Sequence, residues 1–156
     1  MKLSDFLVCD AIIPELAAKD RNGVIRELVG SLAACGAIDS SQADAIAKTA
    51  IRRETEGSTG FGKGVAVPHV KCDGIEKMAC TIGRSSTGVD FAALDRAPVY
   101  TVVLLVSPKN DPDAHLAAME QIFRHLQRDN FRRFLRQADT KEAVTELIRE
   151  ADDLAG

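Results

Sequence analysis

The sequence predicts an α/β domain whose central mixed sheet is covered by helices on both faces. Helical patterns come before, between and after the candidate strands, as expected when helices cover both faces of a sheet. The run Val99–Val106 is apolar at almost every position, which is typical of a strand buried on both faces. The short connection between it and the candidate strand Ala79–Arg84 allows some antiparallel pairing. We therefore expect a mixed sheet.

Composition limits the class of protein. With 156 residues the chain is long enough to build a continuous core, and we expect one domain over residues 1–156. Hydrophobic residues make up 46% of the chain and charged residues 28%, and no apolar run is long enough to span a bilayer. Neither a disordered nor a membrane-inserted protein is expected. The formal net charge of -3, with acidic and basic residues mixed, does not favour nucleic-acid binding.

Two features indicate a cytoplasmic protein. Asp5 and Asp10 interrupt the apolar run near the start, and no small-residue cleavage site of a secretory leader follows. The four cysteines are widely and irregularly spaced, which does not fit a disulfide framework. We expect the chain to work in a reducing compartment.

The first half of the chain predicts two helices. Asp20 can cap a helix that ends near Gly36, with an apolar face of Val24, Ile25, Leu28, Val29, Leu32 and Ala33. Ser40 or Ser41 can begin a second helix that runs to Gly57, with Ile46, Ala47, Ala50 and Ile51 on one face. Each helix is expected to pack on one side only.

Two further strand candidates are Ala11–Glu15 and Val65–Val67. The second is apolar on successive positions and ends at Pro68, as expected for a strand buried on both faces. The residue after that proline, His69, is therefore expected at the rim of the sheet.

The last part of the chain predicts three helices. Asp111 followed by Pro112 provides a cap and a first-turn proline for a long helix. Its inward face is expected to be Leu116, Met119, Ile122, Phe123 and Leu126. A short helix over Asn130–Arg136 and a last one from Thr140 through Ile148 complete the fold. His125 is flanked by polar residues on the long helix and is expected at the surface.

His69 is the main candidate for chemistry, and two interpretations of it stay open. It is either a hydrogen-bonded structural histidine at a strand end or a nucleophile. A neutral imidazole attacks through one nitrogen when the other donates its proton to a fixed acceptor such as a backbone carbonyl. Its unperturbed pKa of roughly 6.5 leaves it mostly neutral near pH 7.

His115 and Arg53 are candidate partners for an anion carried by His69. His115 lies in the first turn of its helix, where amide hydrogens and the helix dipole favour a nearby anion. Arg53 precedes the glycine-rich turn, and its fork of donors suits a phosphate. The alternatives are a histidine at the core edge for His115 and a solvated or helix-capping arginine for Arg53.

The alternating Gly60, Gly62 and Gly64 do not form a known nucleotide-binding motif. Val65 stands where the dinucleotide fingerprint needs a glycine, and Lys63 is not followed by serine or threonine as in a triphosphate-binding loop. The glycines fit a turn with positive backbone angles, which also allows close approach to an anion.

A metal site is the competing hypothesis for the same histidine. His69 and Cys72 have ligand-like spacing, and His115 is a candidate third ligand. No second close pair of cysteine or histidine residues supports it.

These residues together resemble a known family. The run Arg53-Glu54, Ser58-Thr59-Gly60, Gly62, Gly64 and Val65-Ala66-Val67-Pro68-His69 resembles the IIA domain of the bacterial phosphoenolpyruvate-dependent sugar phosphotransferase system, in its fructose, mannitol and nitrogen-regulatory class. Further along the chain, the resemblance continues in the same order with Gly88-Val89-Asp90-Phe91, Pro108, His115-Leu116 and Thr140-Lys141-Glu142. It covers nearly the whole chain.

The resemblance implies a three-layer α/β/α sandwich and a phosphohistidine relay without a cofactor. His69 would receive a phosphoryl group from the histidine phosphocarrier protein and pass it to a IIB cysteine or use it as a regulatory signal. Arg53 and His115 would hold the phosphoryl oxygens, and Thr59, Gly60 and Gly62 would line the pocket. Because no IIB or IIC segment is attached, the resemblance is to the nitrogen-regulatory proteins, while a sugar-specific IIA acting with separate IIB and IIC chains stays open. A binding module of the same fold without phosphotransfer is the alternative.

Overall fold

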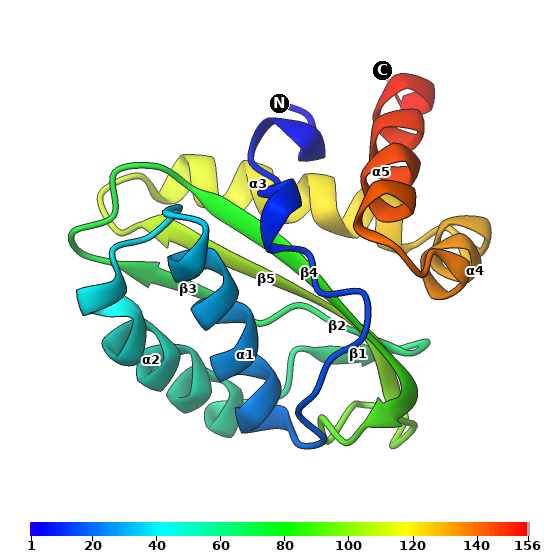
Figure 1. Ribbon diagram of the computed structural model, residues 1–156, viewed down its shortest axis with the longest axis horizontal. Coiled ribbons are helices and arrows are strands. Elements are labelled where there is room, and N and C mark those ends of the chain that lie inside the picture. Colours follow the sequence, from blue (N-terminus) through cyan, green and yellow to red (C-terminus); the bar gives the residue numbers. More distant parts are fainter. Residues whose placement is uncertain (156) are drawn as a thin grey trace.

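A computed structural model of the protein describes residues 1–155 and has the predicted three-layer α/β/α architecture, as Figure 1 shows. One sheet lies in the middle, with α1 (Arg21–Ala34) and α2 (Ala43–Glu56) on one face. On the other face lie α3 (Pro112–Leu126), α4 (Asp129–Gln137) and α5 (Lys141–Ala155). Short 3-10 helices cover Leu3–Asp5, Cys9–Ala11 and Ser40–Gln42.

The sheet is mixed, as predicted, and is built around β5 (Val99–Pro108). Along one edge of β5 run two short parallel strands in succession, β2 (Val65–Ala66) and β3 (His69–Cys72). Along its other edge runs the antiparallel strand β4 (Ala79–Val89), while β1 (Gly60–Gly62) pairs antiparallel with β2. The edge of β3 that faces away from β5 has no strand partner among residues 1–155.

Alternation along the central strand divides the core between the two faces. Val102, Leu104 and Val106 pack with α1 and α2, whereas Val103 and Leu105 pack with α3, α4 and α5. Because successive side chains of a strand point to opposite faces, a strand apolar at every position fills both cores at once. This explains why the apolar run predicted the centre of the sheet correctly.

The predicted helix starts are confirmed in detail. Asp20 accepts a hydrogen bond from the Gly23 amide at 2.7 Å, and Asp111 accepts one from the Ala114 amide at 3.1 Å. Both carboxylates satisfy amides that have no partner inside their helix. Of the described residues, none form a helix long and apolar enough to cross a bilayer.

Close packing between β4 and the first helix depends on a glycine. A Cβ placed on Gly83 would lie 2.7 Å from Leu16 and 2.9 Å from Leu28, both of which are fully buried. The absence of a side chain at Gly83 therefore lets α1 and the N-terminal segment lie directly on the strand.

Three predictions about local structure are wrong. Ala11–Glu15 forms no strand of its own; Ile13 makes an isolated bridge with Gly83 at the edge of β4. Leu116 was expected inside but is 60% exposed, because the inward face of α3 is rotated toward His115, Ala118, Met119, Ile122, His125 and Leu126.

His125 is the third of these, since it is fully buried rather than on the surface. Its Nε2 lies 3.0 Å from Oδ1 of Asp152, a carboxylate that also accepts the amides of Leu3 and Ser4. Burial alone raises the pKa of Asp152, but hydrogen bonds from Ser4, His125 and Leu3 outweigh it and lower the pKa. The buried imidazole is paired through Nε2 with a carboxylate on α5, which is far away in sequence.

Candidate functional site

A cavity of about 850 Å³ lies at the free edge of β3 and is lined by residues of α2, β3 and α3. Its polar lining includes Thr49, Arg53, His69, Lys71, His115 and Glu120. Leu116, Met119 and Phe123 form an apolar side of the same cavity. The structure thus brings together the three residues that were singled out for chemistry, Arg53, His69 and His115.

His69 was expected at the rim of the sheet, directly after the end of a strand. It is instead the first residue of the edge strand β3, where it pairs with Leu105 of β5. The reason is Pro68, which has no N–H and interrupts the ladder to β5 while its carbonyl still accepts the Leu105 amide at 3.0 Å. The strand therefore resumes at His69, and the half-buried ring reaches the cavity from the edge of the sheet.

A backbone carbonyl determines which nitrogen of His69 carries the proton. Nδ1 lies 2.8 Å from the carbonyl oxygen of Val67. Since a carbonyl only accepts, Nδ1 must be the donor, and in the neutral ring Nε2 then holds the free lone pair. This is the arrangement that a nucleophilic imidazole requires.

His115 faces His69 across the cavity. The two ring centroids are 5.4 Å apart and the ring planes are tilted by 48°. Burial, with smaller contributions from the charges of His69 and Lys71, lowers the pKa of His115 to about 4. The ring is therefore neutral near pH 7 and carries a single N–H.

Arg53 lies near the end of α2, and its Nη1 donates to the Gly57 carbonyl at 2.8 Å. This bond uses one of its donors for the helix end, as the structural alternative predicted, but the side chain also lines the cavity. Lys71, Lys109 and Glu120 line the same cavity, and none of these charged groups has an ion-pair partner within residues 1–155. Cations outnumber carboxylates at the site although the whole chain is acidic.

The residues predicted to line the pocket on the glycine-rich side lie elsewhere. Thr59 is buried and donates both its amide and its hydroxyl to the carboxylate of Glu54. Gly60 lies against Ala93, and Gly62, with a φ of 104°, lies against Asp95. None of Thr59, Gly60 and Gly62 lines the cavity beside His69, so the structure does not support the predicted pocket wall.

The metal hypothesis fails on strand geometry. His69 and Cys72 are three positions apart in β3, so their side chains point to opposite faces, and Cys72 packs against the core beneath α1 and α2. Across residues 1–155, no group of three histidine, cysteine or acidic side chains is placed to hold a metal ion. Despite their ligand-like spacing, His69 and Cys72 do not face a common site with His115.

Sequence analysis missed two residues next to the candidate histidines. Lys71 is two positions after His69, and the period of two in a strand would have placed both side chains on one face. Ser107 lies under His115 near the end of β5, and its hydroxyl is in contact with that ring. No local pattern predicts this second contact, because it joins a strand to the helix that follows it.

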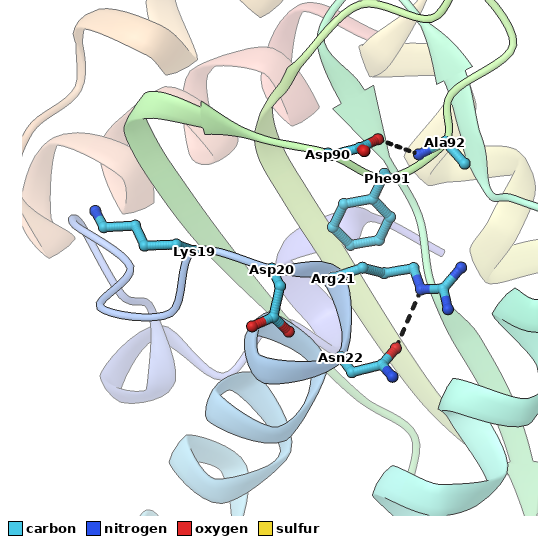
Figure 2. A pocket seen from close by; sticks show the side chains of 7 residues that line it. All are labelled: Lys19, Asp20, Arg21, Asn22, Asp90, Phe91 and Ala92. Carbon is cyan, nitrogen blue, oxygen red and sulfur yellow. Dashed lines mark hydrogen bonds between the residues drawn. The ribbon is translucent and has the colours of Figure 1, made fainter.

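A second hollow, of about 320 Å³, lies at the start of α1 and is lined by Lys19, Asp20, Arg21, Asn22, Asp90, Phe91 and Ala92 (Figure 2). Its polar groups mostly bond to their own neighbours: Arg21 donates to Asn22 at 3.1 Å, and Asp90 accepts the Ala92 amide at 2.9 Å. It contains no histidine or cysteine. His69 and His115 line the first cavity and not this one.

Comparison with known proteins agrees with the geometry. Residues 5–151 match the family model described as "Phosphoenolpyruvate-dependent sugar phosphotransferase system, EIIA 2". The chain therefore belongs to the IIA family of the phosphotransferase system, as its resemblance predicted.

Curated relatives fall into two groups. A nitrogen regulatory protein of Bradyrhizobium diazoefficiens is 28% identical over 95% of both chains, and one of Pseudomonas aeruginosa is 37% identical over 68% of this chain and 69% of its own. The fructose-specific EIIABC component of Bacillus subtilis is 30% identical over 97% of this chain, which spans only 24% of that longer protein.

Solved structures confirm the fold. Nitrogen regulatory protein IIA-Ntr of Neisseria meningitidis superposes with a TM-score of 0.83 over 94% of this chain and 98% of its own, at 23% identity. Mannitol IIA of Escherichia coli, solved as a complex with phosphorylated mannitol IIB, has a TM-score of 0.75 over 90% of this chain and 95% of its own, at 18% identity. At such identities the similarity shows the fold alone.

Proposed function

We propose that this protein is a phosphohistidine carrier in which Nε2 of His69 accepts a phosphoryl group from the histidine phosphocarrier protein. The observation that carries the proposal is the hydrogen bond from His69 Nδ1 to the Val67 carbonyl, since it leaves Nε2 as the nucleophilic nitrogen. As Nε2 forms its bond to phosphorus, the bond between phosphorus and the donor's imidazole nitrogen breaks, and that nitrogen keeps the electron pair. No oxidation and no cofactor enters this exchange.

The cavity supports this chemistry electrostatically. In phosphoryl transfer, charge on the three equatorial oxygens is met by cations and donors that are already in place. Arg53 supplies a fixed positive charge with several donors, and neutral His115 supplies one N–H. We assign both to the phosphoryl oxygens. In a transport role, a IIB cysteine accepts the phosphoryl group from His69. In a regulatory role, the phosphorylated protein is itself the signal.

Similarity to the nitrogen regulatory proteins supports the regulatory role. The nitrogen regulatory proteins of Bradyrhizobium diazoefficiens and Pseudomonas aeruginosa are 28% and 37% identical to this chain, over 95% and 68% of it. We further propose that the protein acts in the cytoplasm as one IIA-type domain over residues 1–156, with a regulated protein as its target. Delivery to a sugar-specific IIB is the second candidate, since fructose-specific proteins are also similar in sequence.

The test is phosphorylation by the general phosphotransferase proteins and phosphoenolpyruvate, followed by intact-mass measurement. The wild type should gain one acid-labile phosphoryl group, and His69→Ala should gain none. His115→Gln is the matched control, because it removes the other histidine of the cavity while keeping the nucleophile, and it should gain the group more slowly. An adduct that persists in His69→Ala refutes the site, and a wild type that gains none favours the binding module.

A further inference from the structure

The contact beneath His115 involves a serine that neither the sequence analysis nor the proposed mechanism uses. Ser107 is the second-last residue of β5 and is fully buried. Its Oγ lies 2.7 Å from Nδ1 of His115. A buried hydrogen bond of this length at the base of the candidate site restricts both the rotation of the ring and the position of its proton.

The direction of this hydrogen bond follows from counting donors. A serine hydroxyl has one hydrogen to donate, and within residues 1–155 the only hydrogen-bond partner of Ser107 Oγ is His115 Nδ1. If Nδ1 carried the ring proton, the hydroxyl hydrogen would be buried without an acceptor, which is unfavourable. The favourable arrangement has Ser107 donating to an unprotonated Nδ1.

It follows that the proton of the neutral His115 ring is on Nε2. The ring is only 8% exposed and lines the cavity opposite His69. With Nδ1 bonded to the strand below, Nε2–H is the polar group that remains for the cavity. An unprotonated Nε2 would instead present a lone pair to phosphoryl oxygens, which also carry only lone pairs.

We propose that Ser107 is a positioning residue that holds His115 in the Nε2–H tautomer and so presents a hydrogen-bond donor to a phosphoryl group on His69. The identity of that group rests on the proposed function, whereas the tautomer does not. The two histidines thus carry their protons on different nitrogens. The Val67 carbonyl accepts from Nδ1 of His69 and leaves Nε2 as the nucleophile, whereas the Ser107 hydroxyl donates to Nδ1 of His115 and leaves Nε2–H as the donor.

Nitrogen chemical shifts test the tautomer directly. The chain has three histidines, so a long-range proton–nitrogen correlation spectrum of the labelled protein at pH 7 is simple to assign with His115→Gln. The wild type should show a protonated Nε2 and an unprotonated Nδ1 for His115. In Ser107→Ala both shifts should move toward the average of the two tautomers. A protonated Nδ1 in the wild type, or unchanged shifts in Ser107→Ala, overturns the proposal.

Phosphoryl transfer provides the second measurement. Ser107→Ala should lower the initial rate of adduct formation roughly tenfold through loss of a preplaced donor, and Ser107→Thr, which keeps a hydroxyl, should restore most of it. The matched control is Thr81→Val on β4, since Thr81 is also fully buried but its hydroxyl has no hydrogen-bond partner within residues 1–155. Rates that are equal in the wild type and Ser107→Ala refute the positioning role.

The two arms separate this inference from the function on which it rests. A wild type with the Nε2–H signature but no adduct refutes the carrier function and supports the assignment of Ser107 to the tautomer. An adduct on a protein whose His115 is protonated at Nδ1 supports the carrier function and refutes the role of Ser107.

Discussion

At the scale of single residues, the site depends on the protonation of two neighbouring imidazoles. Nδ1 of His69 and Nδ1 of His115 are each bonded, to Val67 and Ser107, so that Nε2 is the free nitrogen of both rings. The proposed difference between a nucleophile and a donor arises from one atom beside each ring, the Val67 carbonyl oxygen for His69 and the Ser107 hydroxyl for His115. Substitutions at the supporting residues should therefore alter chemistry without removing either histidine.

His115 should make the stability of the fold depend on pH. Its pKa is lowered from 6.5 to about 4 by burial and by the charges of His69 and Lys71, so the unfolded chain binds more protons between these values. Stability from this group is present above pH 6.5 and is lost as pH falls toward 4. Between pH 7 and pH 5 the free energy of unfolding should drop by about 2 kcal/mol more in the wild type than in His115→Gln. Urea unfolding of both proteins at the two pH values measures this difference, and equal pH dependence would contradict it.

At the scale of elements, the packing of β4 against α1 leaves no room for a methyl group. Gly83→Ala should lower the free energy of unfolding by about 1–3 kcal/mol, since its Cβ would overlap Leu16 and Leu28 in the core. Gly30, in the middle of α1, is the matched control because a Cβ there meets nothing within 4 Å. Gly30→Ala should stabilise the protein by about 0.5–1 kcal/mol through helix propensity. Opposite signs in urea unfolding confirm the packing, and a neutral Gly83→Ala contradicts it.

Most elements could be predicted from the sequence because their signals are local. The caps at Asp20 and Asp111 and the apolar run at Val99–Val106 each act within a few residues, and all three are confirmed. The burial of His125 could not be predicted, since its partner is a carboxylate on α5. The polar residues beside His125 suggested a surface position, and no local sequence pattern indicates that Asp152 is its partner.

The candidate site shows the same division. His69, Arg53 and His115 could be chosen from residue type and position in their elements, and the fold brings them to one cavity. Thr59 was misplaced because its neighbours in sequence gave no sign that Glu54 would bind both of its polar groups. Ser107 was missed because its function depends on where the next helix packs.

At the scale of the whole molecule, Asp152 joins the two ends of the chain. It accepts the amides of Leu3 and Ser4 and bonds to His125 on α3. Asp152→Ala should lower the free energy of unfolding by about 3 kcal/mol, since it leaves buried polar groups without a partner. Amide exchange at Leu3 and Ser4 should also accelerate. Asp153→Ala is the control.

The neighbouring Asp153 pairs with Lys2 at 3.8 Å, and both side chains are mostly exposed. Removing this surface pair should change stability by less than about 0.5 kcal/mol. Urea unfolding together with hydrogen exchange compares the two variants. Equal losses in both would show that the N-terminal segment is not held by Asp152.

The cavity is built from both helix layers and from the sheet edge between them. Arg53 comes from α2 on one face, His115 from α3 on the other, and His69 from β3 at the edge. All three side chains are in place only when α2 and α3 are both packed on the sheet. The proposed phosphorylation of His69 would therefore report on complete folding, because its partners come from helices on both faces of the sheet.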